Sequence, residues 1–426
     1  MTHVSGPWPG RGRQQRHTTR HEASQLADMS AQHPATPALP LAGIRVLEWA
    51  QGISGPFCGK LLAEYGAELI KLEPPTGDAA RHTGPFAHDQ PDAEGSLLFL
   101  YLNTAKRSLT LRLDCRAGLR LFEALTRHAD VVISDQASPA LDIMSRHPDL
   151  IHTSIRPLGR HGPGADWPST ELTLEALGGV MAIVGDPDRP PVKVGGEQAH
   201  YLAGLNAAVG TLLALAARDR TGAGQVVDIS VQESLLTILG NIPIMYSHLG
   251  QMTRRIGSRH HRTHPTAIFP CKDGYLGIAA QTPAQWQALC LLVDQPELLL
   301  DPHFATGVQC AEHADELDAL LLPWFLARTR QEVMQACQAR RIPVGLSCTI
   351  PDLLADPQFG ATQFFQVFDH PATGTVQYPG RAFYLQQTPC VHTRAPLLGE
   401  HNESIYGGWL GLSRHERARL RAQGVL

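Results

Sequence analysis

The sequence predicts an α/β fold, in which an open parallel sheet is covered by helices and accompanied by a smaller second domain. Short apolar strands alternate with helical segments through the first half of the chain. The composition then changes across residues 236–335, where His, Arg and Pro become more frequent. The chain has 426 residues, of which 43% are hydrophobic and 18% charged, so it can form two or three domains with a sizeable core.

A strand–loop–helix–strand unit opens the ordered part of the chain. Residues 44–48 have a strand pattern, and a loop rich in Gly, Ser and Pro follows at 52–56. Residues 57–65 carry apolar side chains at helical spacing and stop at Gly66, a favourable helix C-cap. Residues 68–72 form the next strand. Such a unit predicts a right-handed parallel crossover.

The same alternation continues along the chain. We expect strands at 107–113, 131–134, 151–155 and 226–230, and helices at 117–128, 171–182 and 201–217. A hairpin is expected at 268–278 around Asp273-Gly274, and a charged helix at 413–421. Parallel sheets of this kind bind ligands beyond the carboxyl ends of their strands. The loops after Glu48, Leu72 and Ser134 are therefore the expected ligand site.

Charge and composition exclude several classes of function. The 36 Lys and Arg residues against 40 Asp and Glu residues give a net charge of −4, so we expect no nucleic-acid partner. The apolar stretch 202–217 is too short to cross a bilayer and predicts a buried helix, with no membrane association. Eight scattered cysteines suit a reducing cytoplasm. Residues 1–40 lack an apolar signal region and are predicted to be a disordered extension.

The order of several short blocks resembles the class III CoA-transferase family, which includes formyl-CoA transferase, carnitine CoA-transferase and α-methylacyl-CoA racemase. The matching region runs from about residue 41 to residue 426. The blocks lie at 41–47 with Gly55-Pro56, 66–73, 103–108, 129–133, 218–228, 269–275 and 395–401.

The resemblance implies a Rossmann-like large domain built from both chain ends, at 41–235 and 336–426, with a small domain at 236–335. It implies an interlocked dimer, with acyl-CoA and a carboxylic acid as substrates and no permanently bound cofactor. Members of the family with transferase activity use an aspartate that attacks the thioester and forms a mixed anhydride.

His200 stands where the resemblance places that aspartate, directly before the helix that begins at Tyr201. Glu171, 29 residues earlier, matches a glutamate near the family's active site, so the spacing supports the alignment. An imidazole can act as a base or nucleophile but cannot form an anhydride. His200 is therefore a candidate catalytic residue as a base or nucleophile, or it lies at a helix start without chemistry. Another acid could also replace the family aspartate. Glu171 and Glu197 are the candidates for that acid.

The resemblance also implies the residues that contact CoA. These are Ile53, Ser54, Arg81, Lys106, Arg107 and Leu111. The loop around Ile53 and Ser54 could hold adenine or phosphate, or could simply turn the chain. The cations could pair with phosphate or lie on a solvated face. A basic position that the family uses for CoA is Ile143 here, and its mobile glycine-rich loop is replaced by 257–264.

No metal site is expected. His260, His261 and His264 have HxxH spacing but no neighbouring acid or cysteine, which favours a surface loop. The leading hypothesis is a CoA-transferase acting between an acyl-CoA and a carboxylic acid, as a homodimer. The alternative is a non-catalytic subunit that pairs with an Asp-bearing paralogue in a heterodimer. An acyl-CoA racemase is a third, weaker possibility, because the family's His-Asp pair is absent at Thr170-Glu171.

Overall fold

A six-stranded parallel sheet forms the centre of the computed structural model, which describes residues 39–136, 146–260, 262–381 and 383–426. The strands lie in the order β3-β2-β1-β4-β5-β6, which is the Rossmann order. The chain builds the sheet outward from β1 in one direction and then, from β4, in the other. The strands are β1 (Arg45–Trp49), β2 (Glu68–Glu73), β3 (Arg107–Thr110), β4 (Val131–Ser134), β5 (Ile151–Arg156) and β6 (Val226–Ser230).

Helices cover both faces of this sheet because the strand side chains alternate between two cores. Val46 of β1 belongs to a core shared with α2 (Ser54–Glu64), α6 (Glu171–Leu177), α7 (Gln198–Thr221) and α8 (Val231–Ile238). The next residue, Leu47, points into a second core shared with α4 (Arg116–Thr126), α16 (Asn402–Gly408) and residues near α17 (Arg414–Ala422). The predicted parallel sheet with helices on both faces is confirmed.

Helix α7 lies unusually close to the first turn of α2, because Gly204 has no side chain. A Cβ atom at Gly204 would stand 2.6 Å from the Ser54 carbonyl oxygen. By length and hydropathy α7 is the one helix in the described part of the chain that could cross a membrane. Its buried face, from Ala199 to Leu215, packs in the core, which accounts for its apolar composition.

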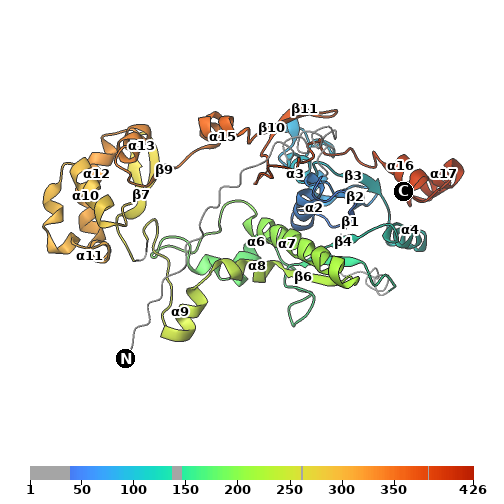
Figure 1. Ribbon diagram of the computed structural model, residues 1–426, viewed down its shortest axis with the longest axis horizontal. Helices are drawn as coiled ribbons and strands as arrows, with labels where there is room; N and C mark the ends of the chain where they lie inside the picture. Colours follow the sequence, from blue (N-terminus) through green and yellow to red (C-terminus); the bar gives the residue numbers. More distant parts are fainter. Residues whose placement is uncertain (1–38, 137–145, 261, 382) are drawn as a thin grey trace, which may run out of the picture.

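The small domain is built on an antiparallel sheet of β7 (Thr266–Cys271), β8 (Gly274–Ala279) and β9 (Val344–Leu346). Its core is filled from the helices around this sheet and lies apart from the parallel sheet in Figure 1. Helix α13 (Arg330–Gln338) crosses the predicted boundary at 335, and β9 pairs with β8. The packing of the small domain therefore extends to Leu346.

The C-terminal segment from Asn402 onward lies against the parallel sheet. The Asn402 side chain accepts a hydrogen bond from the Thr110 backbone N–H at 2.9 Å, and the Tyr406 hydroxyl donates to the Thr110 carbonyl at 2.7 Å. Figure 1 shows α16 and α17, coloured red, beside β3 and α4. Both chain ends thus contribute to the large domain. The predicted extension at 1–40 lies almost entirely outside the described residues.

The remaining elements connect these parts. The α-helices are α3 (Leu97–Leu102), α9 (Ile242–Leu249), α10 (Pro283–Leu292), α11 (Gly307–Glu312), α12 (Ala314–Leu326), α14 (Ile350–Ala355) and α15 (Pro357–Thr362). Short 3₁₀ helices lie at η2 (Ala79–His82), η3 (Ala87–Asp89), η4 (Val180–Ala182), η5 (Pro296–Leu299) and η6 (Pro302–Phe304). A hairpin pairs β10 (Gln366–His370) with β11 (Gly374–Tyr378). Neither α3 nor this hairpin was expected from the sequence.

Candidate active site

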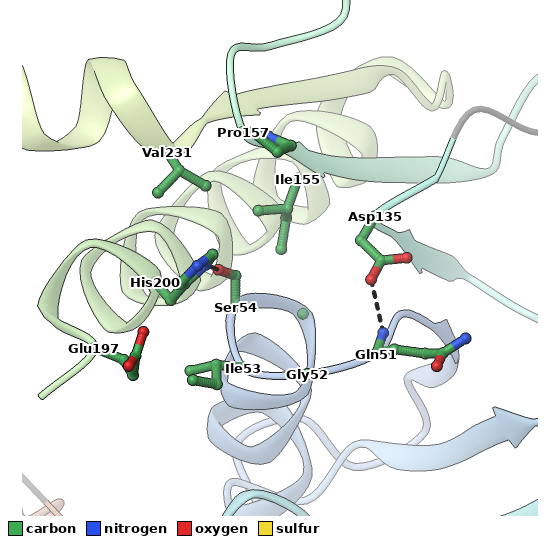
Figure 2. Close-up of a pocket in the computed structure, with 11 residues that line it drawn as sticks. Gln51, Gly52, Ile53, Ser54, Asp135, Ile155, Pro157, Glu197, His200 and Val231 are labelled. Atoms are coloured by element: carbon green, nitrogen blue, oxygen red, sulfur yellow. Dashed lines mark hydrogen bonds between the residues drawn. The ribbon is translucent and has the colours of Figure 1, made fainter. Parts of the chain in front are cut away.

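A cavity of about 290 Å³ opens at the carboxyl ends of β1, β4, β5 and β6. The order of the sheet reverses between β1 and β4, and open α/β sheets bind ligands at such a point. The loop after β1 lines it, together with the residue after β4 and the start of α7 (Figure 2). The lining residues are Gln51, Gly52, Ile53, Ser54, Gly55, Asp135, Ile155, Pro157, Glu197, His200 and Val231.

His200 lies in the first turn of α7 and faces the first turn of α2. Its Nδ1 atom is 2.9 Å from the Ser54 hydroxyl oxygen, and Figure 2 shows the two side chains meeting in the cavity. Burial lowers the pKa of His200 below its ordinary value of 6.5, and the negative charge of Glu197 opposes this effect. The imidazole is therefore neutral at pH 7 and can accept a proton.

Glu171, the first residue of α6, holds the start of α7 in place. Its carboxylate accepts hydrogen bonds from the backbone N–H groups of Ala199 at 2.8 Å and His200 at 3.3 Å. Two N–H groups that the beginning of a helix leaves without partners are thereby satisfied. One Glu171 oxygen also lies 3.9 Å from His200 Nε2. Burial raises the pKa of Glu171, although the two backbone N–H groups oppose this.

Glu197 is the carboxylate that lines the cavity beside His200 (Figure 2). It precedes α7, and its backbone has non-helical angles of φ −118° and ψ 56°. Atoms of Glu171, Glu197 and His200 that could bind a ligand lie within 4.8 Å of one another. Glu171 is occupied by the backbone of α7, whereas no described residue donates a hydrogen bond to the Glu197 carboxylate. Glu197 is thus available for chemistry.

Asp135 is a second acid in the cavity, and it directly follows β4. One carboxylate oxygen accepts a hydrogen bond from the Gln51 backbone N–H at 2.8 Å (Figure 2). The other oxygen is buried and has no partner among the described residues. Burial raises the pKa of Asp135 from 3.8 to about 6. The cavity therefore contains a carboxyl group that titrates close to neutral pH.

Comparisons with known proteins identify the family. A model described as CoA-transferase family III matches residues 41–402. A succinyl-CoA–D-citramalate CoA-transferase from Chloroflexus aurantiacus is 34% identical over 93% of this chain and 100% of its own length. The chain belongs to CoA-transferase family III. The β subunit of a succinyl-CoA–L-malate CoA-transferase from the same organism is 32% identical over 92% of this chain and 99% of its own length.

A solved structure agrees with the assignment to family III. The crystal structure of a CaiB/BaiF family protein from Brucella suis superimposes with a TM-score of 0.79 and 30% sequence identity. The superposition covers 87% of this chain and 99% of the Brucella suis chain. The family predicted from the sequence blocks is thereby confirmed, and so is the α/β architecture with its parallel sheet.

Only two of the six predicted CoA contacts, Ile53 and Ser54, line the cavity of this family III member. Arg81 is fully buried and pairs with Glu73 at 2.6 Å and Glu94 at 2.7 Å. Binding a phosphate would require Arg81 to leave two carboxylates. The contact between Arg81 and CoA therefore stays a prediction, and the structure gives Arg81 two carboxylate partners instead.

Lys106, Arg107 and Leu111 also lie outside the cavity lining. The Lys106 ammonium is buried and donates to Glu48 at 2.8 Å and to the Pro56 carbonyl at 2.7 Å. Arg107 pairs with Glu68 at 2.6 Å, and Leu111 is buried in the core that contains α4. Lys106 and Leu111 have structural roles here, because each is enclosed by protein atoms. Ile143 lies outside the described residues.

A network of buried charges supports the loop that carries Ser54. Lys71 bonds Glu48 at 2.9 Å and Asp78 at 2.6 Å, and all three side chains are fully buried. Asp78 in turn accepts a hydrogen bond from the Gly52 backbone N–H at 3.2 Å. The loop after β2 thus supports the site through the hydrogen bond to Asp78, and it does not line the cavity. Removing one member of such a network would leave an unpaired buried charge.

Two side-chain clusters in the described residues have the composition of a metal site. One is the exposed group of His303, His313 and Glu316, and the other is the group of Glu171, Glu197 and His200. In the second group Glu171 and His200 already have partners, so a cation would compete with those contacts. His264 lies instead in the small domain and contacts Asp318 at 2.8 Å. His261 lies outside the described residues.

Gln51 and Asp135 are cavity residues that the sequence analysis did not name. Asp135 directly follows the predicted strand 131–134, and Gln51 comes three residues after the predicted strand 44–48. The carboxyl ends of parallel strands were the expected ligand site. Choosing the first polar residue after each predicted strand as a candidate site residue would have identified Asp135. The position of Glu197 beside His200 depends on the turn into α7, which sequence spacing alone does not specify.

Proposed function

We propose that this chain transfers CoA between an acyl-CoA thioester and a carboxylic acid, and that Glu197 carries the covalent intermediate. The observation that supports this most is the Glu197 carboxylate, which receives no hydrogen bond from the residues that the structure describes and lies next to His200 in the cavity at the β1/β4 boundary. His200 itself occupies the position of the family aspartate. Glu197 supplies the functional group that His200 lacks.

The reaction proceeds through anhydrides. A Glu197 oxygen attacks the thioester carbonyl carbon, the C–S bond breaks, and CoA leaves as the thiolate. The thiolate then attacks the Glu197 carbonyl carbon, which releases the donor acid and leaves CoA on Glu197. The acceptor carboxylate displaces this thiolate to form a second anhydride. Attack of the thiolate on the acceptor acyl carbon yields the new acyl-CoA and restores Glu197.

The names of the relatives indicate only the chemical class of the substrates. Two relatives are named for succinyl-CoA as donor and for a hydroxylated dicarboxylic acid as acceptor. Succinyl-CoA with a dicarboxylic acid is therefore the first pair to test. CoA is a substrate in this scheme, and no resident cofactor is needed. We place the reaction in the cytoplasm, where acyl-CoA is available and cysteines stay reduced.

The substitution Glu197→Gln tests this assignment. It keeps the size of the side chain but removes the nucleophilic oxygen, so CoA transfer should fall about 100-fold or more. Transfer from succinyl-CoA to a panel of dicarboxylic acids would be followed by chromatography of the acyl-CoA products. Asp188→Asn, an exposed acid on the same α6–α7 connection, is the matched control and should keep full activity. Full transfer activity in Glu197→Gln would contradict the proposal.

A second function is supported by one relative, which is named a β subunit. In that case the chain would assemble with an Asp-bearing paralogue and supply an interface rather than the nucleophile. The purified chain would then show no transfer alone, and transfer would appear when the paralogue is added. Transfer by the chain alone would exclude this alternative.

A further inference from the structure

Ser54, His200 and Glu171 lie in the order of a nucleophile, a base and an acid that orients the base. Ser54 is the first residue of α2, is only 7% exposed and lines the cavity. Its hydroxyl is 2.9 Å from His200 Nδ1, and the other ring nitrogen lies 3.9 Å from the Glu171 carboxylate. This constellation is recognised by geometry and roles rather than by sequence order.

We propose that Ser54 and His200, positioned by Glu171, hydrolyse acyl-CoA thioesters in this cavity. The inference rests on the proposed function only in assuming that a CoA thioester binds there. It adds a second activity, which uses water in place of a carboxylic acid and Ser54 in place of Glu197.

Hydrogen bonding determines which ring nitrogen of His200 is available. When the Ser54 hydroxyl donates to Nδ1, the proton of the neutral ring is on Nε2, which is the atom nearer Glu171. Glu171 and Glu197 are the carboxylates that face the ring, and both favour the imidazolium that forms when Ser54 is deprotonated. Burial keeps the resting ring neutral. His200 is thus arranged to accept the Ser54 proton.

The first turn of α2 provides hydrogen-bond donors for the developing oxyanion. The backbone N–H groups of Ser54 and Gly55 have no acceptor in the described part of the chain, as expected at a helix start. The positive end of the helix dipole lies at the same place. Donors and dipole next to a nucleophile stabilise the charge of a tetrahedral intermediate.

The reaction has two steps. The Ser54 oxygen attacks the thioester carbonyl carbon while its proton passes to His200. The C–S bond then breaks, and the proton goes to the sulfur, which releases CoA and leaves an acyl ester on Ser54. In the second step His200 takes a proton from water, the hydroxide attacks the ester carbon, and the same proton returns to Ser54. The net reaction converts acyl-CoA and water into a carboxylic acid and free CoA.

This route differs chemically from CoA transfer. A carboxylate acceptor would have to convert the Ser54 ester into an anhydride, which is a higher-energy acyl group. Hydrolysis through Ser54 and transfer through Glu197 therefore depend on different side chains in one cavity. Each activity can be removed without the other.

The test measures both activities on the purified full-length chain. Free thiol release from succinyl-CoA and acetyl-CoA is followed without added acid, and transfer is followed with added dicarboxylic acids. Ser54→Ala and His200→Ala should each lose about 100-fold or more of the hydrolysis, and Ser54→Ala should lose a much smaller share of transfer than of hydrolysis. Glu197→Gln should show the opposite selectivity, with transfer lost and a much smaller share of the Ser54-dependent hydrolysis lost. Ser134→Ala is the matched control, because Ser134 makes a buried 2.7 Å hydrogen bond to His152 away from the cavity lining.

Glu171 is a positioning residue, so its test needs a readout beyond loss of activity. Glu171→Gln should lower kcat for hydrolysis and leave KM unchanged, because it does not contact the substrate. Loss of its charge should also move the acid limb of the pH profile to lower pH, since the imidazolium of His200 becomes less favoured.

The outcomes separate this inference from the proposed function. Hydrolysis that is unchanged in Ser54→Ala, or absent in a chain that still transfers CoA, would overturn the triad and leave the transferase intact. If the unmodified chain hydrolyses acyl-CoA but transfers no CoA, and Ser54→Ala abolishes the hydrolysis, the triad is supported and the transferase is overturned. If CoA thioesters neither react nor bind, as judged by calorimetry with acetyl-CoA, both proposals fail.

Discussion

At the residue scale, three acids at the site differ in state because their surroundings differ: Asp135 and Glu197 line the cavity, and Glu171 lies behind the start of α7. The Glu171 carboxylate accepts hydrogen bonds from two N–H groups of α7, whereas none of the described residues donates one to the Glu197 carboxylate. Asp135 is buried, which raises its pKa to about 6, and one of its oxygens has no partner among the described residues. Only an acid free of such constraints can act as a nucleophile without breaking structural contacts. This difference favours Glu197 for covalent chemistry.

Asp135 makes stability depend on pH. In the unfolded chain its carboxyl group titrates at the ordinary value of 3.8, whereas in the folded protein it holds its proton up to about pH 6. The raised pKa means that folding stability falls as the pH rises from about 4 to 6 and stays lower above that range. Asp135→Asn should therefore raise the free energy of unfolding by on the order of 2 kcal/mol at pH 7.5.

Thermal unfolding at several pH values checks this prediction. The advantage of Asp135→Asn should shrink as the pH falls towards 4, because the Asp135 carboxyl group of the folded protein is then protonated and no buried charge remains. Asp130→Asn is the control, since Asp130 also accepts a backbone N–H but pairs with Arg218 at 3.0 Å. It should not stabilise the protein. Equal melting temperatures for wild type and Asp135→Asn at pH 7.5 would rule out a costly buried charge.

At the element scale, the site depends on the contact between the starts of α2 and α7. Gly204 lies one turn after His200 and allows α7 to approach the Ser54 backbone. Glu171 fixes the first N–H groups of α7 from α6. The distance between Ser54 and His200 is therefore set by helix packing rather than by the loops alone.

Gly204→Ala should disturb this contact. The added methyl group would lie 2.6 Å from the Ser54 carbonyl oxygen, which belongs to the backbone and cannot rotate away. We expect a loss of about 1–3 kcal/mol in stability from overpacking, larger than the gain in helix propensity. Both thiol release and CoA transfer should fall at least about 10-fold. Gly360→Ala in α15 serves as the control, because a Cβ atom added at Gly360 would have no other atom within 4 Å. A Gly204→Ala protein with normal stability and activity would refute the role of this packing.

Much of this arrangement of elements could be predicted from the sequence. Strand 226–230 and the helix at 201–217 followed from apolar periodicity, and the structure places them at β6 and α7. The CoA contacts were less predictable, because Arg81 and Lys106 are paired with acids that are distant in sequence. Spacing identified His200, but only the turn before α7 places Glu197 in the cavity. Tertiary pairing of charges is the part that local patterns do not encode.

At the scale of the whole molecule, α7 exposes an apolar strip on the side away from the sheet. Leu205, Val209, Leu212 and Leu213 are 41–66% exposed. A neighbouring hollow of about 220 Å³ is lined almost entirely by apolar atoms, from Leu61, Leu205 and Phe383 among others. Apolar surfaces of this extent are typical of contacts between subunits. They support the proposal that two copies of the chain form a dimer.

Leu213→Glu should weaken this dimer, because a charge would be buried in an apolar interface. Sedimentation velocity at micromolar concentration should show a dimer for the wild type and a shift towards monomer for Leu213→Glu. Leu300→Glu is the matched control, since Leu300 is 87% exposed in the small domain and lies outside the strip. A wild type that sediments as a monomer would contradict the dimer.

The central claim is that the covalent carboxylate is Glu197. In the anhydride route one oxygen of the acceptor acid remains on the enzyme carboxylate after each turnover. The most direct measurement therefore incubates the chain with succinyl-CoA and ¹⁸O-labelled succinate, then digests it with trypsin and analyses the peptides by mass spectrometry. Lys193 lies between Glu171 and Glu197, so cleavage places them on different peptides. The account predicts ¹⁸O in the peptide that contains Glu197; label on the Glu171 peptide, or on neither, would contradict it.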